Sequence, residues 1–189
     1  MKLSNIALYE KVRFLLNGGI FSEPITRTLE IKDNETVLDF GCGTGAYSQS
    51  IRSNYIGIDI NDSLITYARN KYGSPRKKFL QGSLDNILKN KLIKKVDKGM
   101  IVNVLHHLSN AEIHENLSLL NKVVKKSLVI VDMDKEGSNL FQKFLYLLDD
   151  GHYIRSQSQF KQLIEEHFTI KKTSIFFSPT KSIRMCLFY

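Results

Sequence analysis

The sequence predicts an α/β fold in which a mostly parallel sheet is covered by helices on both faces. Short apolar segments alternate with segments of helical periodicity through most of the chain. A glycine-rich turn, Gly41-Cys-Gly-Thr-Gly45, directly follows the first apolar segment, and the carboxylate of Asp59 ends the second. Alternation of this kind favours parallel strands joined by crossover helices.

Each element follows from its own pattern. Apolar runs predict strands at residues 36–40, 55–59, 78–81, 97–102 and 127–132. Helical spacing is found at residues 5–17, 22–30, 46–52, 62–71, 84–90 and 110–125. Asn61 or Asp62 can cap the helix that follows, and Ser109 with Glu112 has the spacing of a capping box. Near the end, residues 168–177 and 182–189 predict two more strands joined by a turn-like Ser-Pro-Thr-Lys segment.

Length and composition fit one globular domain. The 189 residues are 42% apolar and 24% charged, and no stretch reaches the ~18 apolar residues that a membrane helix needs. The N-terminus is interrupted by polar residues too early for a signal peptide. Cys42 and Cys186 are expected to be free thiols. We therefore expect a cytoplasmic protein.

The net charge of +8 allows two interpretations. Lysines cluster at residues 89–98, 122–126 and 171–172, and a basic surface could hold an RNA or DNA substrate. The other interpretation is a solvated, lysine-rich surface, because the clusters fall at expected helix ends and loops with few aromatic residues between them. We favour the second and keep nucleic acid as the alternative.

The glycine turn and Asp59 together indicate a site for an adenosine-containing cofactor. Glycines let the backbone approach a ligand closely, and a carboxylate at the end of the next strand can accept hydrogen bonds from a ribose diol. The turn also fits the loose dinucleotide pattern of nicotinamide enzymes. Asp39 argues against that alternative, since a negative charge is poorly placed beside a pyrophosphate and better suits a ligand with an ammonium group. The chain also leaves little length for a substrate domain.

These residues resemble the motifs of a known enzyme family. Asp39-x-Gly41-x-Gly43-x-Gly45, followed by Gly57-Ile-Asp59, is similar to motifs I and II of the class I S-adenosylmethionine-dependent methyltransferases. Residues 79–84, 97–108 and 128–132 resemble the family's third, fourth and fifth strand motifs, in the same order. The resemblance covers roughly residues 33–135. It implies a Rossmann-like three-layer sandwich with seven strands, the last inserted antiparallel between strands five and six.

The resemblance also implies a set of cofactor contacts. S-adenosyl-L-methionine would bind with Asp39 near the methionine ammonium and Asp59 on the ribose, and S-adenosyl-L-homocysteine would be the product. Many family members carry Asp where Ser83 stands, so the adenine contact could fall to Ser83 or to Asp85. The predicted cofactor-binding residues are Asp39, Gly41, Cys42, Gly43, Gly45, Asp59, Ile60, Gly82, Ser83, Leu84 and Asn103.

Two histidines follow the fourth predicted strand, where the methyl group of the cofactor would lie. His106 or His107 could act as a general base, since histidine titrates near neutral pH. The alternative is that one histidine packs under the loop while the other faces the pocket or solvent. A metal site is not expected, because no Cys, Asp or Glu stands at ligand spacing. The loop also lacks the [D/N/S]-P-P-[Y/F/W] turn of nucleobase amino-methyltransferases.

Residues 133–160 form a long connection that is expected to lie over the carboxyl ends of the strands. Apolar residues at 140, 141, 144, 145 and 148 suggest a lid helix. His152, Tyr153 and Arg155 are then the candidates for substrate contact, with Tyr9 in the N-terminal helix as a further choice. The alternative is a helix cap with an ordinary surface arginine.

We therefore predict a single-domain methyltransferase that acts on an O, N or C atom of a small molecule. Its parts would be a helical cap (1–32), a cofactor-binding core (33–135), a lid-like excursion (136–158), and a last helix with a hairpin (159–189). An RNA or protein methyltransferase is the nearest alternative. A nucleotide-cofactor oxidoreductase and a non-catalytic cofactor-binding module remain as alternatives from other classes. We expect a monomer or a homodimer.

Overall fold

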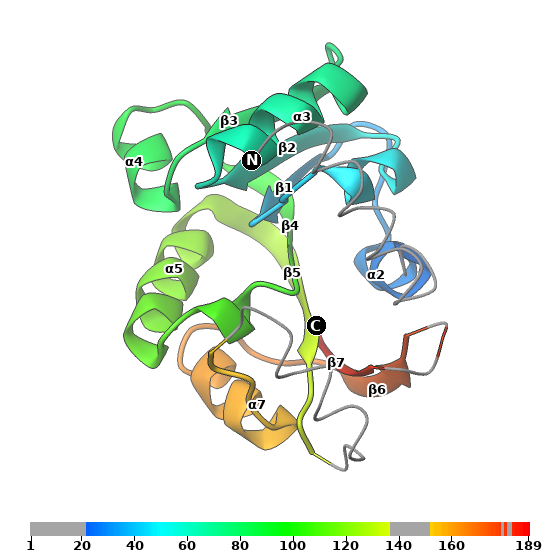
Figure 1. The fold of residues 1–189 in the computed structure, drawn as a ribbon, viewed down its shortest axis with the longest axis vertical. Helices are drawn as coiled ribbons and strands as arrows, with labels where there is room; N and C mark the ends of the chain where they lie inside the picture. The colour runs from blue at the N-terminus through cyan, green and yellow to red at the C-terminus, as the bar shows by residue number, and fades with distance from the viewer. Residues whose placement is uncertain (1–21, 137–151, 179, 181–182) are drawn as a thin grey trace.

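The computed structural model describes residues 22–136, 152–178, 180 and 183–189. Seven strands in these ranges form one sheet in the order β3-β2-β1-β4-β5-β7-β6 (Figure 1). Strands β1 to β5 are parallel, and β7 runs antiparallel to both β5 and β6. This confirms the predicted sandwich with its inserted last strand. The strands are β1 (Thr36–Phe40), β2 (Asn54–Asp59), β3 (Lys77–Gln81), β4 (Val96–Val102), β5 (Val124–Met133), β6 (Thr173–Phe177) and β7 (Arg184–Phe188).

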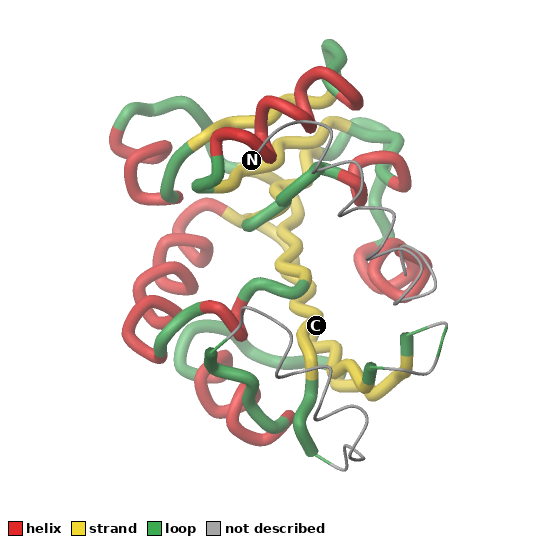
Figure 2. The backbone as a smooth tube through the Cα atoms, viewed as in Figure 1, coloured by secondary structure: helices red, strands yellow, loops and turns green. Residues whose placement is uncertain are grey.

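Helices cover the sheet on both faces and enclose two apolar cores. One face packs against α2 (Ser22–Leu29), the 3₁₀ turn η1 (Ala46–Ser50) and α3 (Asp62–Tyr72). The other packs against α4 (Leu84–Lys89), α5 (Asn110–Val123) and α7 (Gln157–Glu165). The tube view in Figure 2 shows the yellow strands passing between these two groups of red helices. Successive buried strand residues alternate between the two cores, as strand geometry requires.

Local signals fix most of the helix boundaries. The Asn61 side chain accepts a hydrogen bond from the Leu64 N–H and begins α3, and Ser109 and Glu112 form the predicted capping box of α5. Several boundaries differ from the prediction, most of all at β6, which begins at Thr173 and not at residue 168. Residues 46–50 form a 3₁₀ turn, and α5 ends at Val123 because Val124 is already extended and pairs with Val96 of β4. β5 therefore starts three residues earlier than predicted.

The strand order reverses between β1 and β4, and ligands of parallel α/β sheets bind beside the carboxyl ends of the strands at such a point. The predicted site residues follow β1, β2, β3 and β4 there. The predicted helix at 5–17, Tyr9 and the lid helix at 140–148 lie outside the described residues, so the division of the chain into four parts remains a prediction. No helix of the described ranges has the length and apolarity to cross a membrane.

Candidate functional site

The glycine turn connects β1 to η1 and lies directly against the ends of β2 and β4. The Gly41 and Cys42 N–H groups both donate to the Ile58 carbonyl of β2, at 2.8 and 3.0 Å. Gly41 and Gly45 have φ angles of 73° and 74°, where side chains are rarely found. A Cβ on either would also come within 2.5 Å of Val104 or Phe79. Tight packing thus requires these two glycines, whereas a Cβ on Gly43 would meet nothing within 4 Å.

Asp59 lies at the carboxyl end of β2 beside that open position. Its Oδ2 accepts from the Gly43 N–H and its Oδ1 from the Asn61 N–H, both at 2.9 Å. These two bonds fix the carboxylate plane between the turn and the start of α3. The predicted pairing of the glycine turn with the second acid is therefore realised across β1 and β2.

The third predicted motif adjoins Asp59. Ile60, directly after Asp59, is 75% exposed. The Gly82 N–H donates to the Asp59 carbonyl, which brings the end of β3 next to that of β2. Ser83 caps α4 by accepting from the Asn86 N–H, and the Leu84 side chain is fully buried. Asp85 makes an ion pair with Lys89. Ser83 and Asp85, the two predicted adenine contacts, thus both have structural partners in α4.

Asp39 is buried in β1 on the face of the sheet that packs against α2 and η1. It is 1% exposed, and its Oδ2 accepts a 2.5 Å hydrogen bond from the Tyr55 hydroxyl of β2. Cys42 lies close to both Asp39 and Asp59, and burial together with these two charges raises the pKa of its thiol far above the ordinary value. Cys42 therefore stays protonated and contributes shape rather than nucleophilic chemistry.

Asn103 follows β4 with a backbone conformation that side chains seldom adopt. Its φ is 56°, and its Oδ1 is buried with no hydrogen-bond partner among the residues that the structure describes. The next residue, Val104, packs against Gly41, so Asn103 borders the glycine turn. Strain of this kind and an unpaired buried oxygen are both costly, and they concentrate at functional sites.

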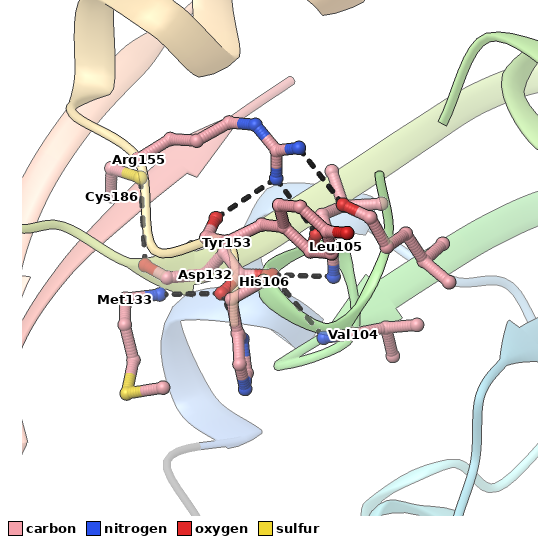
Figure 3. Close-up of polar contacts among 9 residues, drawn as sticks. Val104, Leu105, His106, Asp132, Met133, Tyr153, Arg155 and Cys186 are labelled. Carbon is pink, nitrogen blue, oxygen red and sulfur yellow. Dashed lines mark hydrogen bonds and ion pairs between the residues drawn. The ribbon is translucent and has the colours of Figure 1, made fainter. Parts of the chain in front are cut away.

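Asp132 organises the loop that holds the two histidines (Figure 3). It is fully buried at the end of β5, and its Oδ2 accepts from the N–H groups of Val104 and Leu105 at 3.2 and 2.8 Å. Its Oδ1 lies 2.5 Å from Nδ1 of His106, which is 1% exposed. The exposed His107 stacks on His106, with ring centroids 4.1 Å apart. The two predicted histidines thus differ sharply in environment.

Arg155 binds the same loop from the other side, as Figure 3 shows. It is 7% exposed, and its side chain donates to the carbonyls of Leu105, Leu108 and Tyr153. Its Nε and Nη2 also donate to the Asn110 side chain. These five bonds use all five N–H donors of a guanidinium. A substrate anion would have to displace protein acceptors to bind Arg155.

The other two predicted substrate residues lie at the surface beside this loop. Tyr153 is 44% exposed, its N–H donates to the His106 carbonyl at 2.9 Å, and its ring packs on the Arg155 guanidinium. His152 is exposed. The structure thus brings His152, Tyr153 and Arg155 to the histidine loop.

Two residues that shape the site were given no role by the sequence analysis. Asp132 had a detectable signal, because it ends a buried strand just as Asp59 does. Tyr55 had none, since a tyrosine in an apolar strand ordinarily packs in the core. Within the described ranges, no group of three or more His, Cys, Asp or Glu side chains could hold a metal ion.

Comparisons with known proteins agree with this geometry. Residues 37–127 match the model of a methyltransferase domain family. A search among curated protein sequences finds no match. A SAM-dependent methyltransferase structure from Aquifex aeolicus superposes with a TM-score of 0.70 at 21% identity, covering 100% of this chain and 97% of that one. The magnesium protoporphyrin IX methyltransferase of Synechocystis, with bound SAH, superposes with a TM-score of 0.61 at 20% identity, covering 82% of this chain and 73% of that one. A putative methyltransferase of Bacillus halodurans superposes with a TM-score of 0.66 at 19% identity, covering 82% of this chain and 72% of that one.

Identities this low establish a common fold, and the family match covers the segment that contains the glycine turn, Asp59 and the histidine loop. Residues 37–127 therefore match a methyltransferase domain, and the described sheet has the fold of the SAM-dependent methyltransferase structure from Aquifex aeolicus.

Proposed function

We propose that this domain holds S-adenosyl-L-methionine at the carboxyl ends of β1 to β4 and methylates an O, N or C atom of a small molecule. The observation that carries the cofactor site is the Asp59 carboxylate, fixed by the Gly43 N–H next to an open glycine face. A ribose diol can donate to the outer lone pairs of that carboxylate. The exposed Ile60 offers an apolar surface to the adenine, and the unpaired Oδ1 of Asn103 offers an acceptor to the ammonium.

When bound, the cofactor supplies a methyl group on a positively charged sulfur. The residues of this chain orient the two reactants and exclude water, which are large contributions to such a transfer. His106 is the candidate base for an acceptor that must lose a proton. With the Asp132 Oδ1 as acceptor of their bond, Nδ1 carries the hydrogen and Nε2 would take the proton. His107, stacked outside it, would act by packing.

The position of the positive charge supports a small acceptor over RNA. The lysines at residues 94–95, 125–126 and 171–172 lie at the amino ends of β4, β5 and β6. A cavity of about 230 Å³ at the same edge is lined in part by Lys126 and Lys171. The seven residues of β4 separate this edge from Asn103 by roughly 20 Å. A phosphate backbone held by these lysines would lie far from the transferred methyl group.

Calorimetry with S-adenosylhomocysteine and with NAD tests the cofactor assignment. We expect S-adenosylhomocysteine to bind and NAD to give no heat, and the reverse result would favour the oxidoreductase alternative. RNA binding should be weak, insensitive to sequence and lost with salt. Selective RNA binding that persists at ~150 mM salt would instead make RNA the substrate.

A further inference from the structure

We infer that Tyr55 is a positioning residue for the cofactor's amino-acid end and acts through the carboxylate of Asp39. The inference rests on the proposed function and on the expectation that the Asp39 charge lies near the methionine ammonium, to which Asn103 offers an acceptor. Tyr55 itself lies one strand away from the glycine turn and touches the ligand at no point in this scheme. Its role would be to fix the direction in which the Asp39 charge points.

The strand register places the Tyr55 hydroxyl beside the Asp39 carboxylate. Val37 of β1 pairs with Tyr55 of β2, and Asp39 pairs with Gly57. Tyr55 therefore lies on the same face of the sheet as Asp39, beside the residue two positions before it in β1. The phenol ring extends diagonally across the two strands to the Asp39 carboxylate. Its hydroxyl donates to Asp39 Oδ2 at 2.5 Å, while Tyr55 and Asp39 are each 1% exposed. A short bond between two buried groups fixes both side chains.

The surroundings hold the ring in this position. Phe79 packs against it at a tilt, with ring centroids 5.6 Å apart. A Cβ on Gly57 would come within 2.7 Å of the Cys42 sulfur and 2.9 Å of Phe79, so a side chain could not fit beside Asp39. The bare Gly57 backbone thus keeps this face open for the cluster of Cys42, Phe79 and the Tyr55 ring.

The proton of this bond stays on the tyrosine. Burial and the negative charge of Asp39 raise the pKa of Tyr55 well above its ordinary value. Tyr55 therefore keeps its proton at physiological pH and donates it to the Asp39 carboxylate. Donation of a neutral hydroxyl stabilises a buried carboxylate without cancelling its charge. A carboxylate held in this way can still attract an ammonium group.

A purely structural bond and a positioning bond predict different ligand responses. If Tyr55 only stabilises the core, removing its hydroxyl should affect every ligand of the site to the same degree. If it orients Asp39, the loss should fall on ligands that carry the amino-acid end. S-adenosylhomocysteine has this end, and 5′-methylthioadenosine has the same nucleoside without it.

The experiment measures both dissociation constants by calorimetry on the full chain and its Tyr55→Phe variant, with thermal unfolding in parallel. We expect Tyr55→Phe to weaken S-adenosylhomocysteine about tenfold and to leave 5′-methylthioadenosine unchanged. In an Asp39→Asn background the same substitution should cause no further selective loss. Tyr72→Phe is the matched control, because its hydroxyl bonds only to the exposed Gln49 among the described contacts, and it should change neither constant.

Equal weakening of both ligands, or no weakening of either, would overturn the inference. If Tyr55→Phe fails to unfold cooperatively, 3-fluorotyrosine at position 55 provides the test, since it keeps the ring and makes the hydroxyl a stronger donor. An unchanged ratio of the two constants would then count against the inference. The proposed function fails separately: it is overturned if the unaltered protein does not bind S-adenosylhomocysteine at all.

Discussion

Two neighbouring halves of the site are built in opposite ways. In the half formed by β1, β2 and β3, Asp59 is held by backbone N–H groups of its own turn and of Gly43, next to an open position. In the half formed by β4 and β5, Asp132 is fully buried and its oxygens are used by the loop, His106 and Met133. The Asp59 carboxylate is fixed but still accessible to a ligand, whereas both oxygens of Asp132 accept hydrogen bonds from groups of the protein itself. The same residue type at the end of a parallel strand is therefore left accessible in one half and serves architecture in the other.

The largest effect should follow from Asp132→Ala. This change leaves three backbone N–H groups and His106 without their acceptor, so we expect the free energy of unfolding to fall by about 3–5 kcal/mol. Urea denaturation followed by circular dichroism measures the loss. Asp85→Ala, which breaks only a surface ion pair within α4, is the matched control and should cost under ~0.5 kcal/mol. Similar losses in the two variants would remove the architectural role of Asp132.

Arg155→Ala tests whether the arginine belongs to the architecture or to the acceptor. Three loop carbonyls and Asn110 would lose their donor, so we expect unfolding to become easier by about 2–4 kcal/mol. Lys161→Ala on α7, an exposed residue in a long ion pair with Glu165, should change stability by no more than ~0.5 kcal/mol. If Arg155→Ala leaves stability unaltered but slows methyl transfer, the original prediction that Arg155 contacts the substrate would be favoured.

Asp59→Ala should weaken cofactor binding with little loss of stability, unlike the two preceding variants. Loss of a charge-assisted bond to the ribose costs about 1.5–3 kcal/mol, which raises the dissociation constant of S-adenosylhomocysteine roughly ten- to hundredfold. Stability should change by about 1 kcal/mol at most, because Gly43 and Asn61 lie at the surface end of the turn. Calorimetry on the folded variant decides the matter, with Asp62→Ala as a neighbouring control. Unchanged affinity in folded Asp59→Ala would refute the ribose contact.

The smallest effect on ligand affinity is expected for Asn103→Gly. This variant distinguishes the role of the backbone conformation from that of the side-chain carboxamide. Glycine accepts the φ of 56° without strain, and its greater freedom in the unfolded chain offsets that gain, so stability should stay within ~1 kcal/mol. If the carboxamide contacts the ammonium, S-adenosylhomocysteine should still bind about three- to tenfold more weakly. Lys91→Gly, at a φ of 54° on the opposite edge, is the matched control and should not alter affinity. Full affinity in Asn103→Gly would mean that only the backbone conformation matters at this position.

The cofactor half could be predicted because its signals are local. The positive φ angles of the glycine turn and the bond from the Asn61 N–H to Asp59 depend on a few consecutive residues, and the parallel alignment of β1 and β2 then brings the two segments together. Even the antiparallel last strand followed from the resemblance, although its motifs cover only about residues 33–135. The errors in the fold were a 3₁₀ turn in place of the predicted helix at 46–52 and several shifted boundaries, such as the start of β5, where Val124 pairs with Val96.

What the sequence alone determined was therefore the fold class, the position of the glycine turn and the place of Asp59 beside it, since these depend on backbone conformation and strand order. Only the tertiary structure decided which polar side chains form hydrogen bonds within the protein and so are not available to a ligand. The bonds from Tyr55 to Asp39, from Asp132 to His106 and from Arg155 to Leu105 join residues 16, 26 and 50 positions apart. Such pairs leave no periodic trace in the sequence, because the requirement that a buried polar group find a partner fixes the partner's place in space and not its place along the chain.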